Sequence, residues 1–510
     1  MPVMISPKLL KARAYEAEQE KRIPEEDRPV VHLTPRTGWM NDPNGFSWYG
    51  GAYHLFYQYH PYSTHWGPMH WGHAVSKDLI HWEYLPAAMA PDTKADRNGC
   101  FSGCALTLPG GRQELVYTGV ADRTLEDGSL LGVQTQCIAI GDGINYEKLP
   151  ENPVLTEKDL PAKFSPYDFR DPKVWKKEDG NYRMLCAAKT RDGNDTAYLM
   201  FESEDALHWR FEKVFVRNSD LPEAIGTTYE CPDFFTMDHQ GVLVASSQNL
   251  AVSSWHGTGF RSFALIGSMD EETDSFTPKM AQSLDDGPDF YAAQTILSPD
   301  GRRILIGWMQ SWETVDVQEK GCRYFGQMSL PRELTLRDGK LYQNPVRELE
   351  AYRTGECRTA LVRLSDGTMQ ELSGISGRSL DLELELDVSP EETGACCREF
   401  TLHLAAGDET LAELVFRPEE GLLTLDRSAC GTGNAAADIC STKLDTEEGT
   451  LHLRIILDLS GVEIFADGGE KALSMMLRKK REEYHLMLSV IGEAKVQARA
   501  WNLQRRENRT

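Results

Sequence analysis

A seven-residue sequence that recurs along the chain limits the possible folds more than any other feature. Residues 76–82 (SKDLIHW) match residues 203–209 (SEDALHW), and Asp142 with Tyr146 repeats the Asp and an aromatic residue four positions later. Successive copies are 64 and 63 residues apart, and weaker copies occur at Asp270 with Phe276 and at Asp338 with Tyr342. A four-stranded propeller blade with generous loops fills such a period.

Five units of this length would extend from about residue 28 to residue 345. The sequence there consists of short runs of Val, Ile, Tyr, Trp and Phe broken by Gly, Pro, Asn and Asp, which is typical of strands and turns. Ten of the eleven Trp residues lie at or before Trp312, so the composition changes near the end of this region. The alternative is that a short Asp-turn-aromatic pattern recurs by chance in β-rich sequence, since only three copies are clear.

Two different segments flank the repeats. Residues 6–22, rich in Lys, Glu, Ala and Leu after a Ser-Pro start, predict a short amphipathic helix. Beyond residue 355, polar and apolar residues alternate regularly, as in SLDLELELDVS, which predicts an antiparallel β-sandwich. We therefore expect an all-β fold, a five-bladed β-propeller followed by a C-terminal β-sandwich. Its parts would be a helical leader (1–27), the propeller (28–345), a linker (346–355) and the sandwich (356–510).

Three acidic residues lie at nearly the same position within their repeat units. Asp42 is in WMNDPNG (39–45), Asp171 in RDP (170–172) and Glu230 in ECP (230–232). They precede the repeated Asp of their own unit by 36, 34 and 40 residues, and Ser102 precedes Asp142 by a similar 40. If this position is the innermost strand of each blade, the carboxyl groups meet in one central pocket, with Phe101 and Ser102 beside them.

Clustered carboxyl groups are what the hydrolysis of a glycosidic bond requires. One attacks or stabilises the developing oxocarbenium carbon, and another protonates the leaving oxygen. Like charges held close together raise at least one proton affinity, which keeps an acid protonated near neutral pH. Aromatic rings provide apolar surfaces for sugar faces, and five Trp residues crowd the first unit: Trp39, Trp48, Trp66, Trp71 and Trp82.

The charge balance argues against polyanionic partners. Lys and Arg total 54 against 78 Asp and Glu, a formal net charge of −24, which opposes binding to nucleic acid or to anionic lipid. No stretch reaches the roughly 18 consecutive apolar residues of a membrane helix, and the first residues are charged where a secretory signal would be apolar. The eleven Cys residues form no CxxC pair, as expected of reduced thiols. We expect a cytoplasmic protein.

Histidines are concentrated in the first repeat unit. Six of the thirteen lie between His54 and His81, and His70 with His73 could be interpreted as metal ligands. No HExxH helix accompanies them, and the region has the pattern of strands and loops. Pocket-wall or packing roles are favoured, and neither a metal nor another cofactor is expected.

In its motifs the chain resembles the β-fructofuranosidases of glycoside hydrolase family 32, which include invertases, sucrose-6-phosphate hydrolases, inulinases and levanases. The resemblance covers nearly the whole chain and is carried by WMNDPNG, FYQ (56–58), HWGPMHWGHAVSKDLIHW (65–82), CFSG (100–103), FRDPKVW (169–175), YECPD (229–233), DFYAAQ (289–294), MSLPREL (328–334) and LSGVEIFADGG (459–469). It implies the propeller and sandwich, a retaining mechanism and no cofactor.

The resemblance also implies residue roles. Asp42 matches the nucleophile that forms a fructosyl ester at C2, Glu230 matches the acid/base, and Asp171 matches the transition-state stabiliser. Further positions match those that shape the fructose subsite: Asn41, Gln58, Trp66, Phe101, Ser102, Arg170, Tyr291 and, less closely, Trp308. Relatives often have a Trp just before MSLPREL, where this chain has Cys322-Arg323-Tyr324-Phe325, so the aglycone side stays open.

The expected function is that of a retaining exo-β-fructosidase. It would hydrolyse the terminal non-reducing β-D-fructofuranosyl bond of sucrose, sucrose 6-phosphate or short fructo-oligosaccharides. A fructosyltransferase and a non-catalytic carbohydrate-binding propeller are alternatives. Whether the substrate is phosphorylated is open, with Lys94, Arg97, Lys189, Arg191 and Arg323 as candidate phosphate contacts. The expected partner is a small carbohydrate, and a sandwich face or the leader helix could mediate a homodimer.

Overall fold

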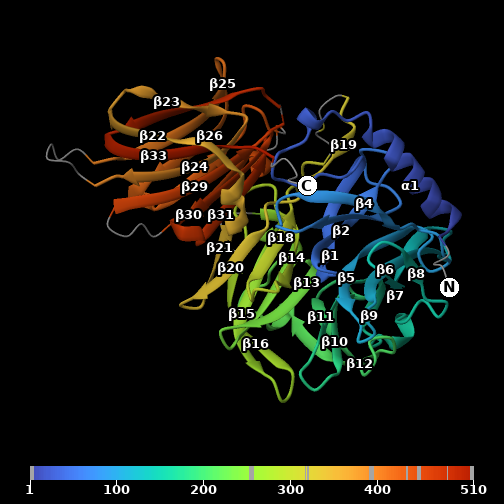
Figure 1. Cartoon of the computed structure of the whole chain (residues 1–510). Coiled ribbons are helices and arrows are strands. Elements are labelled where there is room, and N and C mark those ends of the chain that lie inside the picture. The colour runs from blue at the N-terminus through green and yellow to red at the C-terminus, as the bar shows by residue number, and fades with distance from the viewer. Residues whose placement is uncertain are drawn as a thin grey trace.

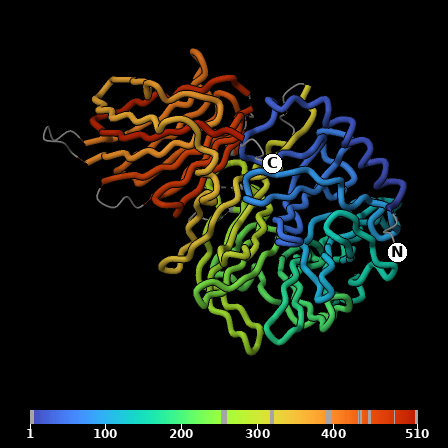
Figure 2. The backbone as a smooth tube through the Cα atoms, viewed as in Figure 1, coloured from blue at the N-terminus to red at the C-terminus, as the bar shows by residue number. Residues whose placement is uncertain are grey.

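The computed structural model describes residues 5–251, 258–315, 318, 321–389, 396–431, 433, 435–444, 449–478 and 480–505. Residues 1–4 and 506–510, at the ends of the expected leader and sandwich, lie outside the described residues. Strands predominate and form seven sheets in the described part of the chain. Figure 1 shows them as two bodies, one blue to yellow and one orange to red, and Figure 2 traces the chain through both.

Five sheets occupy residues 38–345, and each takes its main strands from one continuous stretch of chain. The first contains β1 (Gly38–Tyr49), β2 (Ala52–His60), β3 (His70–Ser76) and β4 (Trp82–Met89), and the second contains β5 (Gly99–Thr107), β6 (Gln113–Thr124), β7 (Leu130–Gly141) and β8 (Tyr146–Lys148). The third contains β9 (Phe164–Lys176), β10 (Tyr182–Thr190), β11 (Thr196–Ser203) and β12 (Arg210–Arg217). The fourth contains β13 (Thr228–Met237), β14 (Gln240–Ala251), β15 (Thr258–Asp270) and β16 (Ser275–Ser283), and the fifth contains β17 (Tyr291–Leu297), β18 (Arg303–Trp308), β20 (Arg332–Arg337) and β21 (Lys340–Pro345).

The first strand of each sheet lies at the centre of this body. Strand β1 contacts β5, β5 contacts β9, β9 contacts β13, β13 contacts β17, and β17 contacts β1 again. The five first strands therefore form a closed ring, which is the arrangement of a β-propeller. Both the propeller and the innermost position of the first strands are confirmed.

The repeated Asp lies in the turn between the third and fourth strands of every propeller sheet. Its Oδ1 accepts a hydrogen bond from the backbone N–H three residues ahead, at 2.8 Å from Asp78 to His81, 2.8 Å from Asp142 to Asn145, 2.9 Å from Asp205 to His208 and 3.2 Å from Asp270 to Thr273. Asp338 lies in the corresponding turn between β20 and β21. Since such bonds close a tight turn, the sequence repeat has a physical cause in four of the five sheets. The weaker copy at Asp270 is thus confirmed by its hydrogen bond, and the one at Asp338 is supported by its position alone.

A short strand ties the last propeller sheet to the first. Strand β19 (Tyr324–Phe325) leaves the chain between β18 and β20 and pairs in parallel with β1, with Tyr324 opposite Gly38 and Phe325 opposite Trp39. The rings of Trp39 and Phe325 stack with their centroids 5.0 Å apart. The segment that departs from the family pattern therefore extends the first sheet beside its inner strand.

The predicted N-terminal helix is confirmed as α1 (Pro7–Glu20), which packs against β4. Ser6 caps it, since the Ser6 hydroxyl accepts a hydrogen bond from the Leu9 N–H at 3.1 Å, and Pro7 suits the first helical position. The other described helical segments are short: α2 (Ala435–Asp438), η1 (Glu25–Asp27), η2 (Glu157–Asp159), η3 (Asn218–Asp220), η4 (Arg347–Tyr352), η5 (Pro418–Glu420) and η7 (Asp467–Gly469). Within the described residues, no helix has the length and apolar character needed to cross a membrane.

The C-terminal body is a sandwich of two six-stranded sheets. One has the order β22 (Arg353–Ser365), β33 (Glu493–Leu503), β24 (Ser379–Asp387), β29 (Thr450–Asp458), β30 (Gly461–Ala466) and β31 (Lys471–Met476). The other has the order β23 (Met369–Gly377), β32 (Tyr484–Ile491), β25 (Glu399–Ala406), β26 (Glu409–Arg417), β27 (Leu422–Asp426) and β28 (Ile439–Lys443). The first strand begins at Arg353, directly after η4 and three residues before the expected start of the sandwich.

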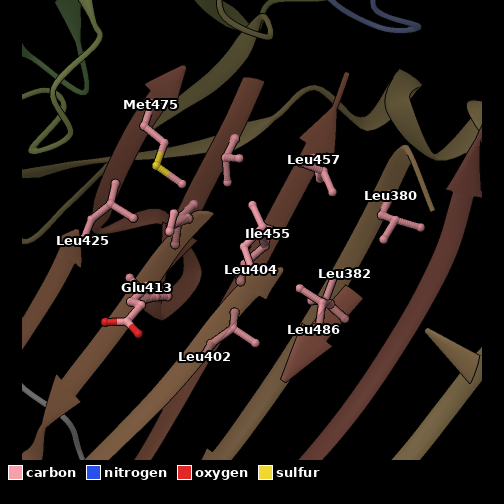
Figure 3. A pocket seen from close by; sticks show the side chains of 14 residues that line it. Leu380, Leu382, Leu402, Leu404, Glu413, Leu425, Ile455, Leu457, Met475 and Leu486 are labelled. Atoms are coloured by element: carbon pink, nitrogen blue, oxygen red, sulfur yellow. The ribbon is translucent and has the colours of Figure 1, made fainter. Parts of the chain in front are cut away.

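Leucines from both sheets fill the interior of the sandwich. Figure 3 shows Leu380 and Leu382 of β24, Leu402 and Leu404 of β25, and Leu486 of β32 around a narrow cavity of about 30 Å³. Alternation along a strand sends neighbouring side chains to opposite faces, so the Leu residues of SLDLELELD enter the core while its acidic residues lie on the other face of the sheet. On that face Asp381 is buried against Arg353 and Arg454.

Buried charges join the sandwich to the propeller. The Nδ1 of His32 lies 2.9 Å from Asp458 Oδ2, and its Nε2 lies 3.0 Å from Glu463 Oε1, with all three side chains fully buried. Arg332 of the propeller donates to the same Glu463 at 2.6 Å. Burial alone would lower the pKa of His32, but the hydrogen bonds to Asp458 and Glu463 outweigh it and raise the pKa to about 9.

Replacing His32 with Leu is expected to lower the free energy of unfolding by about 3–5 kcal/mol at pH 7, because two buried carboxylates lose their shared partner. A raised pKa gives stability that is complete below about pH 6.5 and is lost as the pH rises through about 9. The gap in Tm between wild type and variant should therefore shrink from pH 7 to pH 10. His452→Leu, at an exposed position of β29, is the control, and an equal gap at both pH values would contradict a charged His32.

Candidate active site

A cavity of about 470 Å³ opens at the ring of first strands. Each strand of the ring contributes to its lining, with Asp42 from β1, Ser102 from β5, Asp171 from β9, Glu230 from β13 and Tyr291 from β17. The complete set of lining residues is Asn41, Asp42, Gln58, Trp66, Phe101, Ser102, Gln134, Asp168, Arg170, Asp171, Glu230, Gln248, Phe260, Tyr291 and Trp312. A volume of this size suits a small ligand held by a few polar groups.

Every first strand has an irregularity at its cavity-facing residue. Register shifts fall between Met40 and Pro43, Phe101 and Gly103, Arg170 and Lys173, Glu230 and Asp233, and Tyr291 and Gln294. Such bulges turn a side chain away from the regular alternation. In three of these strands a proline lies within the irregular segment. Proline has no backbone N–H, so no donor is left unpaired at that position of the bulge.

Backbone strain accompanies these bulges. Asp171, Cys231 and Ala292 have φ values of 61°, 50° and 55°, in the left-handed region that L-residues rarely adopt. Each costs about 1 kcal/mol or more, which the surrounding sheets must offset. Strain of this kind is common at functional sites, and here it occurs on three neighbouring strands that face one cavity.

Asp42 is held by two side-chain donors. Ser102 Oγ donates to Asp42 Oδ2 at 2.6 Å, and Asn41 Nδ2 donates to Asp42 Oδ1 at 3.0 Å. Asn41 is itself held by Trp39, whose ring N–H donates to the Asn41 amide oxygen at 2.6 Å. Burial, together with the charge of Glu230, raises the pKa of Asp42 against the opposing effect of these hydrogen bonds. The carboxyl group is therefore oriented but poorly solvated, which suits a nucleophile.

Asp171 lies beside Asp42 and shares a neighbour with it. The Cys231 N–H donates to Asp171 Oδ2 at 3.0 Å, and the Cys231 Sγ lies 3.7 Å from this oxygen and 3.8 Å from Asp42 Oδ2. Burial raises the pKa of Asp171 to about 7; Arg170 opposes the shift, whereas the charges of Glu230 and Asp42 add to it. The two aspartates thus line one wall of the cavity.

Glu230 is held from both sides by polar groups. Arg170 donates to Glu230 Oε1 from Nε and Nη2, both at 3.2 Å, and the Tyr291 hydroxyl donates to Oε2 at 2.5 Å. Arg170 Nε also lies 4.0 Å from Asp171 Oδ2. One guanidinium therefore faces two of the three predicted carboxyl groups, and the structure brings all three together.

The remaining predicted binding residues divide into two groups. Asn41, Gln58, Trp66, Phe101, Ser102, Arg170 and Tyr291 all line the cavity. Trp66 is 49% exposed and packs edge-to-face on Phe101, whereas Gln58 is buried and donates to the Cys100 carbonyl at 2.9 Å. Trp308 is not among the residues that line the cavity: it is fully buried and packs against Trp39 and Trp312, so its match to a subsite position stays a prediction.

Five lining residues were not predicted from the sequence: Gln134, Asp168, Gln248, Phe260 and Trp312. Asp168 and Gln134 contact Arg170, and Phe260 packs on Tyr291 with ring centroids 5.7 Å apart. Asp168 was the one within reach of sequence reasoning, because it lies two positions before Arg170 on the same strand. The others come from loops or from strands that follow the first strand of their sheet, and the repeat does not indicate which residues of those strands reach the cavity.

The candidate phosphate and metal ligands lie elsewhere. None of Lys94, Arg97, Lys189, Arg191 and Arg323 lines the cavity. The described residues contain no group of three or more His, Cys, Asp or Glu arranged to hold a metal ion. His73 is buried, lies 3.0 Å from His54 and stacks on Phe56 at 4.0 Å between centroids, which is a packing role.

A propeller whose central cavity is lined by clustered carboxyl groups is the arrangement of a glycoside hydrolase. The model of the glycosyl hydrolases family 32 N-terminal domain matches residues 32–345, and that of the family 32 C-terminal region matches residues 348–502. The chain therefore belongs to glycosyl hydrolase family 32.

Named relatives cover almost the same length. A sucrose-6-phosphate hydrolase of Zymomonas mobilis is 38% identical over 90% of this chain and 87% of its own. A raffinose invertase of Escherichia coli is 35% identical over 90% of this chain and 91% of its own. The structure of the Bombyx mori family 32 β-fructofuranosidase superposes with a TM-score of 0.81 at 30% identity, over 97% of this chain and 98% of the other.

Proposed function

We propose that this protein is a retaining exo-β-fructosidase that releases the terminal fructose of sucrose, sucrose 6-phosphate or short fructo-oligosaccharides. The observation that carries the proposal is the meeting of Asp42, Asp171 and Glu230 in one cavity, joined through Arg170 and Cys231. The names of the relatives, which include a sucrose-6-phosphate hydrolase and a raffinose invertase, support a fructosyl substrate.

In the first step Asp42 attacks the anomeric C2 of the fructosyl unit. An ester bond forms between the carboxylate oxygen and C2 while the bond from C2 to the leaving oxygen breaks, and Glu230 gives its proton to that oxygen. Ser102 and Asn41 hold the Asp42 carboxylate in one orientation, so little motion is needed before attack.

In the second step water cleaves the ester. Glu230, now ionised, takes a proton from the water while the water oxygen bonds to C2. The bond from C2 to Asp42 breaks at the same time, and Asp42 leaves as a carboxylate. Tyr291 and Arg170 keep Glu230 in place through both proton transfers. Two displacements at C2 return fructose with its original configuration, which is the meaning of retention.

Asp171 and the wall residues hold the sugar in this proposal. A carboxyl group beside the nucleophile can accept hydrogen bonds from fructose hydroxyls and balance the positive charge that develops at C2. Gln58 and Arg170 offer further polar contacts, while Trp66 and Phe101 present ring faces at the exposed side of the cavity. These are the features of a site for a small polyhydroxylated ring.

The test is fructose release by the purified protein without added metal, as kcat/KM on sucrose, sucrose 6-phosphate, 1-kestose and inulin. We expect release from at least the disaccharides, with β-fructofuranose as the first anomer seen by NMR. A first-formed α-anomer would overturn the double displacement. Trisaccharide as the dominant product at high sucrose would indicate a transferase, and binding without release would indicate a non-catalytic propeller.

The cytoplasmic location and the homodimer stay predictions. All eleven cysteines are free thiols, which fits a reducing compartment. The edge strands β22 and β23 of the sandwich expose Leu361 and Met369, at 64% and 61%, a surface of the kind that a second copy would cover. Cell fractionation checks the location, and light scattering distinguishes one copy from two.

A further inference from the structure

Arg170 divides its hydrogen bonds between two carboxyl groups. Its Nε and Nη2 donate to Glu230, while Nη1 donates to Asp168 Oδ1 at 3.3 Å and to Gln134 Oε1 at 3.3 Å. The Asp168 side chain is 37% exposed and lines the cavity, and that of Glu230 is 16% exposed. The guanidinium thus connects a carboxyl group that is open to solvent with the proposed acid/base.

The local fold places Asp168 beside Arg170. Residues two apart on a strand point to the same side, so Asp168 and Arg170 share one face of β9. A second register shift in this strand, between Phe164 and Phe169, precedes the bulge at Asp171. Gln134 of β7 fixes this segment, because its side-chain oxygen accepts from the Phe169 N–H at 2.9 Å. Asp168 therefore lies beside Nη1 of Arg170, the nitrogen that donates to it.

The orientation of Arg170 depends on partners at both ends of its guanidinium. Its Nε and Nη2 reach Glu230, and its Nη1 reaches Asp168 and Gln134. A guanidinium that is hydrogen-bonded at both ends keeps one orientation, and so does the carboxyl group that it contacts. Proton transfer to the leaving oxygen needs Glu230 at hydrogen-bond distance from that oxygen, so the contact between Asp168 and Arg170 supports the geometry of the acid.

We propose that Asp168 is a positioning residue that orients Arg170 and, through Arg170, the Glu230 carboxyl group. The inference rests on the proposed role of Glu230 as acid/base. Asp168 acts through Arg170 and takes no part in bond formation.

The test compares kcat/KM for sucrose between variants at one pH. Asp168→Asn keeps the size of the side chain and weakens its hydrogen bond to Arg170, so kcat/KM is expected to fall about tenfold. Asp168→Glu keeps the charged acceptor and should stay close to wild type. Asp408→Asn, on an exposed turn of the sandwich, removes the same charge far from the cavity and should leave kcat/KM unchanged.

A second substrate separates this role from sugar binding. p-Nitrophenyl β-D-fructofuranoside has a leaving group that does not need a proton, so its kcat/KM should not respond to Asp168→Asn. An equal loss of kcat/KM on both substrates, or an unchanged kcat/KM for sucrose, would overturn the proposal. If wild type itself releases no fructose, the proposed function fails as well, whereas an active wild type with an equally active Asp168→Asn variant overturns only the role of Asp168.

Discussion

Asp42→Asn is expected to lower kcat for sucrose by a factor of about 10⁴ or more, because an amide oxygen is too weak a nucleophile to form the fructosyl ester. Asn preserves the volume of the side chain and can still accept from Ser102. Because burial raises the pKa of Asp42, the folded protein disfavours the ionised form of this residue. The neutral variant should therefore unfold at the same temperature as wild type or at a higher one, which separates loss of chemistry from loss of structure.

Fructose release and a thermal melt, both at pH 6–7, check this expectation. The Asp408→Asn variant serves again as the matched control, since it makes the same chemical change on the sandwich. A kcat for Asp42→Asn within tenfold of wild type would remove Asp42 from the role of nucleophile. A fall in kcat that is accompanied by a clear fall in Tm would indicate a structural role instead.

Glu230→Gln is expected to lower kcat for sucrose by about 10³-fold, because neither the leaving oxygen nor the attacking water has a proton partner. The loss should be much smaller in the first step with p-nitrophenyl β-D-fructofuranoside, since p-nitrophenolate leaves without a proton. Azide needs no general base, so it should accelerate breakdown of the fructosyl ester and give fructosyl azide in the variant alone.

Burst kinetics with the nitrophenyl substrate and mass spectrometry of the azide product measure the two halves of the reaction. Glu126→Gln, at an exposed position between β6 and β7, controls for the change of charge. Equal losses on sucrose and on the nitrophenyl substrate, without azide rescue, would show that Glu230 does not act as the acid/base.

The fold could be predicted because its repeat depends on local chemistry. The Asp side chain closes the same turn in successive sheets, so it marks the sheets even where the rest of the unit has diverged, as at Asp270. The meeting of Asp42, Asp171 and Glu230 could be predicted for the same reason. Residues at a similar distance in sequence from that turn occupy similar positions on the first strand of their sheets.

The rest depends on contacts that no local pattern encodes. Strand β19 pairs with β1 across nearly 290 residues, and the His32 contacts with Asp458 and Glu463 cross the boundary between the two bodies. Trp308 is fully buried against Trp312, whereas the half-buried Trp312 lines the cavity. Which of the two tryptophans reaches the cavity is decided by tertiary packing.

The closed ring of first strands has a consequence for how the protein is made. All three carboxyl groups have left the ribosome once Glu230 has emerged, but β17, which completes the ring against β1, follows about sixty residues later. Until then the sides of β1 and β13 that later contact β17 are uncovered, and contacts between segments so distant in sequence form slowly. A nascent chain arrested before β17 would therefore contain the nucleophile and the acid and still have no enclosed site, so activity should appear only when the last propeller sheet is in place.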